Sequence, residues 1–326
     1  MLCIQHSSTD PYFNMAVEEY VLKEFKDDCF MLWQNEPAII VGKHQNTLAE
    51  INYDYVREKK IKVVRRLSGG GAVFHDLGNL NFTFIMNGED GKLVDFRKFT
   101  QPILDILLKL DINASFEGRN DLTIEGKKFS GNAEHVYKKR VLHHGTLLFS
   151  SLMTDLSKAL KVNPLKYRDK AVKSVRSRVT NISVHLKSDL DVLQFRDMIM
   201  QHIIAMYEDS RFYEFTPEDI AEIRKLRDEK YISWDWNYGY SPKYNFEKMI
   251  KTEGGHIEFH IDVDRGIMQD VRIYGDFFNV LDISDIVESL KGTPHEESSI
   301  REKLGLFNFE NYFSHVSQDE FISGMF

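Results

Sequence analysis

Three consecutive glycines follow two arginines in the segment with the strongest chemical signal, residues 64–79. Glycine has no Cβ, so the backbone N–H groups of Gly69, Gly70 and Gly71 can come close to a ligand and surround an anion such as a phosphate. An arginine from the strand before them can add a two-pronged contact to the same anion. The pattern predicts a phosphate or nucleotide site, and a flexible glycine turn is the structural alternative.

This loop does not match the two common nucleotide-binding motifs. No Gly-Lys-Ser/Thr follows the glycines, as a Walker loop requires, and residues 72–74 continue as strand where a G-x-G-x-x-G motif would open a helix. We therefore expect a nucleotide site outside both families. Because the side chains of a strand alternate between its two faces, only one of Arg65 and Arg66 can readily face the ligand.

Two polar pairs further along the chain could also take part in chemistry. Asn120 and Asp121 lie between apolar runs, where such a pair usually forms a turn, although their oxygens are also suitable ligands for a hard cation. Lys127 and Lys128 follow a Glu-Gly pair, and most lysines in such a place are solvated. Residue type alone therefore does not assign either pair to a site.

Two histidines and a basic run are the remaining candidates. His143 and His144 are neighbours on a predicted strand, so their side chains point to opposite faces, and no third metal ligand lies at a recognised spacing. We interpret both histidines as structural. Residues 166–178 hold six basic residues and one acidic residue, and a run of this kind is usually a solvated face.

Short strands and amphipathic helices must position these residues. Asp10 and Pro11 form an N-cap followed by proline and predict a helix over residues 12–25. Strands do not alternate strictly with helices, so we expect an α/β (α+β) fold of mixed, largely antiparallel sheets flanked by helices rather than a Rossmann sheet. Apolar spacing predicts further helices over residues 96–110 and 190–207, and strands over residues 30–33, 38–41, 62–65, 80–85, 122–124 and 141–149.

A second, smaller domain is expected after the turn-rich stretch 234–243. The chain is long enough for two cores, because single cores rarely grow beyond about 250 to 300 residues. We predict a domain over residues 1–246 that carries the chemistry and an α+β domain over residues 247–326. The elements predicted in the smaller domain are a hairpin of strands 256–263 and 267–274 and helices 283–290 and 296–304.

The composition is that of a soluble globular protein. Of the 326 residues, 42% are hydrophobic and 28% are charged, and no apolar run approaches the roughly 20 residues of a membrane span. The net charge of −8 argues against broad nucleic-acid binding, which needs a basic face. The N-terminus has no export pattern, and Cys3 and Cys29 are too few for a disulfide framework, so we expect a cytoplasmic protein with reduced thiols.

Residues 65–76, Arg-Arg-Leu-Ser-Gly-Gly-Gly-Ala-Val-Phe-His-Asp, resemble the signature of the lipoate-protein ligase A family in its bacterial two-domain form. This family shares its fold with biotin ligases and class II synthetases. Seven matches in the family's order, over most of residues 1–240, are far more specific than one motif. The other six segments that resemble family motifs are 14–19, 37–46, 118–121, 128–131, 143–147 and 174–181.

The resemblance implies an enzyme that activates lipoate with ATP to lipoyl-AMP and pyrophosphate and then transfers the lipoyl group to a lysine side chain. The implied acceptors are lipoyl domains of 2-oxoacid dehydrogenase E2 subunits or the glycine cleavage H protein, and the implied cofactor is Mg²⁺. No nucleic-acid or membrane partner is expected, and the chain is expected to be a monomer. The smaller domain resembles the accessory domain of bacterial ligases.

The same resemblance assigns roles to particular residues. His75 and Asn79 would lie near the adenosine, and Asp121 would bind the metal. Arg176 and Arg178 lie in a segment that, in the family, closes over the adenylate and shields it from water. The residues implied to bind ATP and lipoyl-AMP are Arg66, Ser68, Gly70, Gly71, His75, Asn79, Asn120, Asp121, Lys128, Gly145 and Thr146.

Lys128 is the implied catalytic residue, placed to contact both the lipoyl carboxylate and the phosphate. A phosphate nearby keeps an ammonium charged, so we assign it electrostatic stabilisation rather than nucleophilic attack. Strand alternation and the spacing to the Ser-Gly pair at 130–131 favour Lys128 over Lys127. Lipoate also needs an apolar slot, and residues 33–42 are candidates for its wall.

Three other functions fit parts of this pattern. An octanoyl transferase of the same superfamily needs a cysteine nucleophile in the pocket, and Cys3 and Cys29 lie outside the matching segments. A biotin ligase would carry a basic Gly-Arg-Gly-Arg-Arg-Gly loop, which the sequence lacks. A non-catalytic homologue that binds lipoate or nucleotide without turnover is disfavoured by the presence of Asp121 and Lys128.

Overall fold

The computed structural model describes residues 1–326 except 89–94, 119, 153, 155–157, 161–178 and 278. The described chain forms two compact units. Residues 1–43 and 60–233 make the first unit, and residues 44–59 and 234–326 make the second. The insertion of residues 44–59 into the second unit was not predicted from the sequence.

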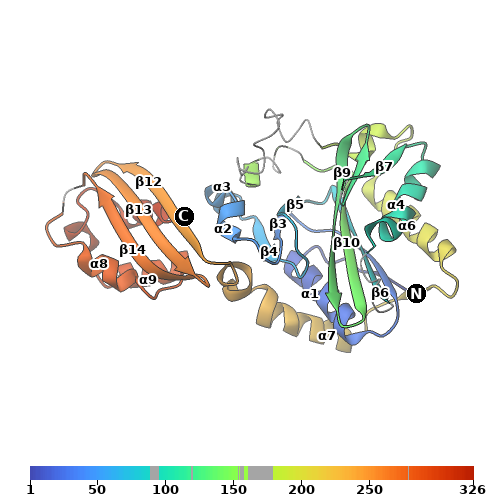
Figure 1. Ribbon diagram of the computed structural model, residues 1–326, viewed down its shortest axis with the longest axis horizontal. Helices are drawn as coiled ribbons and strands as arrows, with labels where there is room; N and C mark the ends of the chain where they lie inside the picture. The colour runs from blue at the N-terminus through green and yellow to red at the C-terminus, as the bar shows by residue number, and fades with distance from the viewer. Residues whose placement is uncertain (89–94, 119, 153, 155–157, 161–178, 278) are drawn as a thin grey trace. The chain divides into compact units, whose positions relative to one another are not determined.

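An eight-stranded mixed sheet forms the centre of the first unit (Figure 1). Its strand order is β11-β1-β2-β6-β10-β9-β8-β7. β1 pairs in parallel with β11 and β2, and the other neighbours are antiparallel. The strands are β1 (Leu2–Gln5), β2 (Cys29–Trp33), β6 (Asn79–Asn87), β7 (Ala114–Glu117), β8 (Asp121–Ile124), β9 (Lys127–Tyr137), β10 (Arg140–Leu148) and β11 (Arg211–Tyr213).

The two faces of this sheet differ chemically, as the alternation along β6 shows. Phe82 and Phe84 point to one face and join a buried core with α4 and α6. Asn81 and Thr83 point to the opposite face, where Thr83 bonds a side chain of α1. One strand therefore supplies apolar core residues and polar site residues. The helices of this unit include α1 (Pro11–Glu24), α4 (Phe96–Lys109), α6 (Val192–Met206) and α7 (Pro217–Leu226).

A three-stranded sheet in the same unit carries the glycine turn. Its order is β4-β3-β5, with β3 (Ala38–Val41), β4 (Lys62–Arg65) and β5 (Val73–His75). β3 pairs in parallel with β4 and antiparallel with β5. The glycines connect β4 to β5, so both ends of the turn are held by strands that share β3 as a neighbour.

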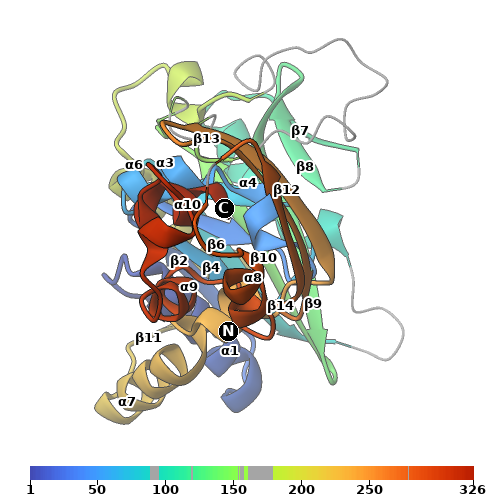
Figure 2. The same cartoon turned by 90° about the vertical axis from the view of Figure 1, so that its left-hand side faces the viewer.

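The second unit contains an antiparallel sheet with helices α8, α9 and α10 on one face (Figure 2). Two short helices from residues 44–59 belong to it as well. Their Tyr53 stacks on Phe326 with ring centroids 4.5 Å apart, and their Arg57 pairs with Glu297 at 3.3 Å. The elements are α2 (Thr47–Glu50), α3 (Tyr53–Glu58), β12 (Tyr244–Thr252), β13 (Gly255–Asp264), β14 (Ile267–Gly275), α8 (Ser284–Leu290), α9 (Glu297–Leu304) and α10 (Gln318–Gly324).

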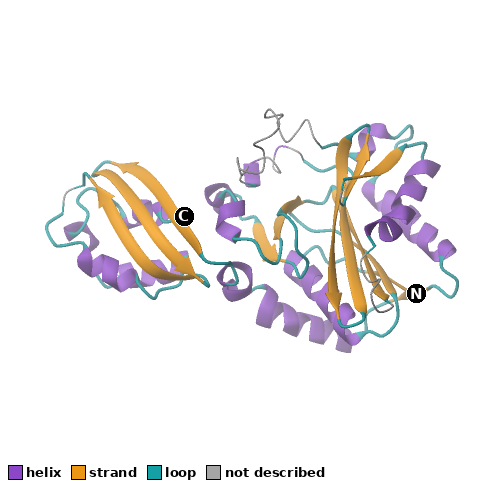
Figure 3. Ribbon diagram, in the orientation of Figure 1, coloured by secondary structure: helices purple, strands orange, loops and turns teal. Residues whose placement is uncertain are grey.

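The mixed, largely antiparallel sheets flanked by helices confirm the predicted fold class (Figure 3). Strand β12 was not predicted, because Lys248 lies on its more covered side while Met249 is 60% exposed, which reverses the expected alternation. The predicted boundary between residues 246 and 247 falls inside this strand, and the second compact unit resumes at Trp234. Among the described residues, no helix combines the length and apolarity needed to cross a bilayer.

Candidate active site

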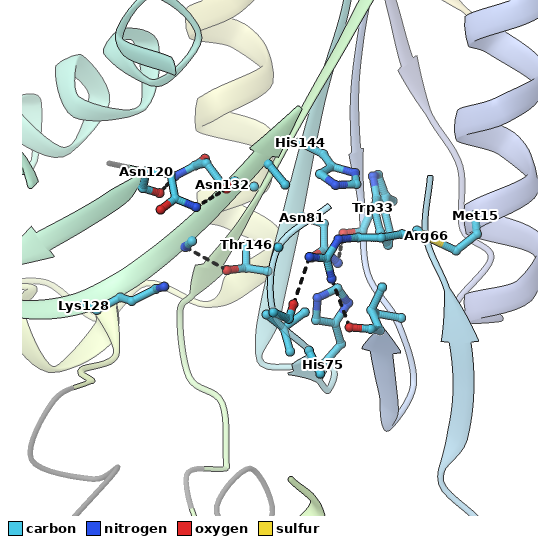
Figure 4. A pocket seen from close by; sticks show the side chains of 18 residues that line it. Met15, Trp33, Arg66, His75, Asn81, Asn120, Lys128, Asn132, His144 and Thr146 are labelled. Carbon is cyan, nitrogen blue, oxygen red and sulfur yellow. Dashed lines mark hydrogen bonds between the residues drawn. The ribbon is translucent and has the colours of Figure 1, made fainter. Parts of the chain in front are cut away.

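A pocket of about 160 Å³ in the first unit joins the glycine turn to strands β9 and β10 (Figure 4). Three predicted site residues, Ser68, Asn79 and Asp121, do not line it, but each bonds a residue that does. Arg176 and Arg178 lie outside the described residues. The predicted site residues that line the pocket are Arg66, Gly70, Gly71, His75, Asn120, Lys128, Gly145 and Thr146.

The guanidinium group of Arg66 holds the glycine turn. Its Nη2 donates to the carbonyl oxygens of Gly69 at 2.6 Å and Gly71 at 2.9 Å. Gly70 has a φ of +93°, and a Cβ there would lie 2.9 Å from the same Nη2, so both backbone and space require glycine. No described residue accepts a hydrogen bond from the N–H groups of Gly70 and Gly71. Gly70 and Gly71 line the pocket, and Arg66 occupies the carbonyls of Gly69 and Gly71.

Arg65 and Arg66 have separate roles. The Arg65 side chain is fully buried, and its Nη1 donates to the carbonyls of Gly42 at 3.0 Å and Lys43 at 2.9 Å. Arg66 lines the pocket, and burial lowers its pKa to about 10, so it stays positive at neutral pH. As strand alternation predicted, only one of the two arginines reaches the pocket.

A buried chain of hydrogen bonds links the turn to helix α1. The hydroxyl of Ser68 accepts from Nε of Arg66 at 3.0 Å and lies 2.6 Å from Nε2 of His144. Nδ1 of His144 lies 2.9 Å from the carboxylate of Glu18, which also accepts from Thr83 at 2.7 Å. The carboxylate makes Nδ1 the donor, so in the neutral ring Nε2 accepts from the Ser68 hydroxyl. Ser68 thus holds two residues that line the pocket.

The two histidines, both interpreted as structural from the sequence, lie on opposite faces of the sheet. His143 is buried, with Nδ1 2.8 Å from Glu134 and its ring against Phe82 and Phe99 in the core. His144 follows it on β10, points to the opposite face and lines the pocket. The alternation was recognised in the sequence, but the face that carries the site could not be identified before the glycine turn had been placed.

Lys128 reaches the pocket from β9. Its ammonium lies 2.7 Å from the carboxylate of Asp121, and the two side chains are 40% and 38% exposed. The β8–β9 pairing shifts here, which leaves Phe129 in the core and Lys127 exposed outside the pocket. A Cβ at Gly131 would lie 2.9 Å from Nζ of Lys128, so glycine makes room for it. A solvated ion pair of this kind can give way to an anionic ligand at small cost.

The strands behind Lys128 are held by a pair of asparagines. Nδ2 of Asn120 donates to the carbonyl of Asn132 at 2.5 Å, and Nδ2 of Asn132 donates to the carbonyl of Asn120 at 3.0 Å. A Cβ at Gly145 would lie 2.2 Å from Oδ1 of Asn132, so this glycine allows β10 to pass closely. The hydroxyl of Thr146 accepts from the Gly131 N–H at 3.2 Å, which leaves its own proton for a ligand.

The pocket also has an apolar wall. Trp33 and Ile40, from the stretch predicted to provide it, line the pocket together with Met15. The indole N–H of Trp33 donates to Thr83 at 3.0 Å, which fixes the ring. Met15 was missed because the apolar face of a helix gives no sign of whether it meets a core or a cavity.

His75 lines the same pocket, and Asn79 bonds a residue that lines it. Burial, followed by the positive charge of Arg66, lowers the pKa of His75 to about 3, so the ring is neutral at pH 7. Asn79 is buried, and its amide donates to Asn81, which lines the pocket, at 2.8 Å. The contact of His75 and Asn79 with adenosine remains a prediction.

The sequence matches the models of two known protein families. Residues 10–204 match the lipoyl protein ligase A/B catalytic domain, and residues 241–325 match the bacterial lipoate protein ligase C-terminus. The chain belongs to the lipoyl protein ligase A/B family.

Individual relatives narrow the class further. The chain is 44% identical to lipoate–protein ligase 1 of Staphylococcus aureus over 316 residues, or 96% of each chain. It is 41% identical to lipoate-protein ligase LplJ of Bacillus subtilis over 327 residues, or 99% of each chain. A solved structure of Plasmodium falciparum LipL1 in complex with lipoate is 26% identical with a TM-score of 0.61, and the match covers 99% of this chain and 97% of that one. A bi-partite lipoate protein ligase from Thermoplasma acidophilum is 27% identical with a TM-score of 0.65, covering 74% and 98%.

Proposed function

We propose that the protein is an ATP-dependent lipoate-protein ligase that forms lipoyl-AMP and transfers the lipoyl group to a lysine of an acceptor protein. The observation that carries the proposal is that the glycine turn and Lys128 line one pocket. Membership of the family, with relatives named lipoate-protein ligases that match over nearly the whole chain, supports it.

The first step joins two anions. A carboxylate oxygen of lipoate attacks the α-phosphorus of ATP, the bond to the β-phosphate oxygen breaks, and pyrophosphate leaves. The N–H groups of Gly70 and Gly71 on one side and the ammonium of Lys128 on the other offset the repulsion between the reactants. Lys128 remains protonated throughout and acts by charge and position.

Asp121 is the proposed protein ligand of Mg²⁺. Magnesium in nucleotide sites usually takes one or two carboxylates and completes its shell with phosphate oxygens and water. The half-exposed carboxylate of Asp121 beside Lys128 suits that role. Within the described ranges, no three His, Cys, Asp or Glu side chains gather to hold an ion, so the nucleotide would have to supply most ligands. Bound Mg²⁺ would neutralise phosphate charge.

The apolar wall fits the acyl chain of lipoate. Met15, Trp33 and Ile40 can cover its hydrocarbon and dithiolane atoms, whose transfer from water to an apolar surface is favourable. The wall and Lys128 line the same pocket, so the carboxylate can meet the ammonium while the chain lies against the indole.

The second step transfers the lipoyl group. The amine of the acceptor lysine attacks the carbonyl carbon of the adenylate, an amide forms, and AMP leaves. The proposed acceptors are lipoyl domains of 2-oxoacid dehydrogenase E2 subunits or the glycine cleavage H protein; the Thermoplasma ligase was studied with its E2 lipoyl domain, which supports this class.

Arg176 and Arg178 are proposed to cover the adenylate. The chain re-enters the described residues at Val179, which bridges to Lys128. We propose a cytoplasmic monomer.

The octanoyl transferase alternative lacks its nucleophile here. Cys3 and Cys29 are both fully buried, and neither lines the pocket. Burial raises the pKa of the Cys29 thiol to about 12, whereas a nucleophilic cysteine needs accessible thiolate.

Exchange of labelled pyrophosphate into ATP tests the proposal. The exchange should require lipoate, because pyrophosphate is released from ATP only when the lipoate carboxylate attacks. Since adenylate formation is reversible, labelled pyrophosphate is then incorporated into ATP. Octanoate in place of lipoate measures the acyl preference of the pocket. Lack of exchange combined with acyl transfer from a carrier protein would support the transferase, and lack of both would support a non-catalytic homologue.

A further inference from the structure

Two buried asparagines connect helix α1 to His75. Nδ2 of Asn14 donates to Oδ1 of Asn35 at 2.8 Å, and Nδ2 of Asn35 lies 3.0 Å from Nδ1 of His75. The three residues are 1%, 0% and 3% exposed. The hydrogen bonds between these side chains therefore orient the three residues relative to one another.

The direction of every hydrogen bond in the row follows from its first member. The two protons of Asn14 Nδ2 also face the carbonyl oxygens of Gln34 at 2.8 Å and Ser8 at 3.2 Å, so one proton is shared between two acceptors, and carbonyls can only accept. Reversing the Asn14 amide would set its oxygen against both. Asn35 therefore accepts through Oδ1 and donates through Nδ2 toward His75. The Nδ1 atom of His75 carries the lone pair, and the proton lies on Nε2.

The Nε2 atom of His75 is buried and has no partner among the residues that the structure describes. His75 lines the pocket, where Figure 4 shows it next to Arg66. Buried donors in folded proteins nearly always meet an acceptor. A ligand atom in the pocket can supply it. In the proposed function the N–H groups of Gly70 and Gly71 and the ammonium of Lys128 serve the phosphates, which leaves the His75 donor for the nucleoside.

We propose that Asn14 and Asn35 are positioning residues that hold His75 as its Nε2–H tautomer, so that the ring donates a hydrogen bond to a lone pair of the nucleoside part of ATP and of the adenylate. The inference rests on the proposed function for the identity of the ligand. The tautomer itself depends only on the hydrogen bonds of the row.

Asn35→Asp tests the proposal because it reverses one bond and keeps the other. A carboxylate oxygen still accepts from Asn14, while the second oxygen requires a donor, so the proton of His75 moves to Nδ1. Side-chain ¹⁵N NMR should place the His75 proton on Nε2 in the wild-type protein and on Nδ1 in the variant. The KM for ATP in pyrophosphate exchange should rise about tenfold, and that for lipoate less than about threefold.

Gln34→Glu is the matched control for charge. It adds the same charge one residue away, where the side chain donates to the carbonyl of Leu77 at 2.6 Å and does not touch His75. The control should retain the Nε2–H tautomer and change the KM for ATP less than about twofold.

A proton on Nδ1 of His75 in the wild-type protein would overturn the proposal, whether or not Asn35→Asp folds. So would a variant whose tautomer is reversed while the KM for ATP is unchanged, or in which only the KM for lipoate rises. If the wild-type protein shows no lipoate-dependent exchange, the proposed function fails instead, and the NMR experiment still decides the tautomer.

Discussion

The glycine turn and the Lys128 strand line the same pocket, but they differ in how far their polar groups are satisfied by folding alone. Arg66 is 6% exposed and bonds two carbonyls of the turn, whereas Lys128 is 40% exposed and held by one ion pair. The glycine turn with Arg66, the glycine side of the pocket, is therefore already ordered before a ligand binds. The strand with Lys128, the lysine side, can still rearrange when a ligand binds. Substitutions on the first side should affect folding and activity together, and those on the second should affect activity alone.

The largest effect is expected for Lys128→Ala. Loss of the ammonium leaves the joining of two anions without its neutralising charge, and lipoate-dependent pyrophosphate exchange should fall on the order of a thousandfold. The melting temperature should stay within about 2 °C, because exposed ion pairs add little to stability. Lys127→Ala is the control, since Lys127 is exposed outside the pocket, and it should behave as wild type. Equal losses in both variants would contradict the assignment of Lys128.

Gly70→Ala should show the coupling expected of the glycine side. The φ of +93° and the 2.9 Å approach to Arg66 both oppose a Cβ, at a cost of roughly 1–3 kcal/mol, which corresponds to about 5- to 150-fold in exchange activity. Gly69→Ala is the matched comparison, because a Cβ there meets no atom within 4 Å and its φ is not positive. The melting temperature and the exchange activity should both fall in Gly70→Ala, and neither should fall in Gly69→Ala.

Acid should weaken the glycine side through His75. Its pKa is lowered from 6.5 to about 3 by burial. As the pH falls below 6.5, the ring is therefore protonated in the unfolded chain but not in the folded one, which favours unfolding. The stability lost between pH 7 and 5.5 from this residue is about 1.3 kcal/mol. In urea unfolding, the free energy of unfolding of His75→Gln should fall between the two pH values by that much less than the wild-type value does. An equal fall in both proteins would contradict a buried neutral ring.

The smallest effect is expected for the stability of Asp121→Asn. The broken ion pair joins two side chains that are about 40% exposed, so the free energy of unfolding should change by less than about 1 kcal/mol. Chemical denaturation measures this separately from exchange activity, which tests the proposed metal ligand. A loss of several kcal/mol would mean that the lysine side is as much part of the folded framework as Arg66.

Local patterns predicted much of the fold. Strands 38–41 and 62–65 match β3 and β4, and helix 12–25 matches α1 within one residue at each end. Helix α7 was missed although Thr216 and Asp219 form a capping box around a proline, a signal that was present in the sequence. The assignment of residues 44–59 to the second unit depends on contacts with residues near the far end of the chain, which no local pattern records.

For the site, motifs identified the residues at its centre but not those that orient them. Glu18, Asn35 and His144 act through partners that are distant in sequence, and their types are ordinary for a helix, a loop and a strand. Their roles follow only when the sheet faces are known. The tautomer of His75 depends on Asn14, sixty-one residues earlier along the chain, as the numbering shows.

The helices α2 and α3 have a practical consequence for making fragments of this protein. An expression fragment that begins at residue 241, where the family C-terminal segment starts, would lose Tyr53 from its stack on Phe326 and Arg57 from Glu297. Its newly bared aromatic ring would favour self-association in the test tube. Supplying residues 44–59 by co-expression, or fusing them through a linker, would restore both contacts.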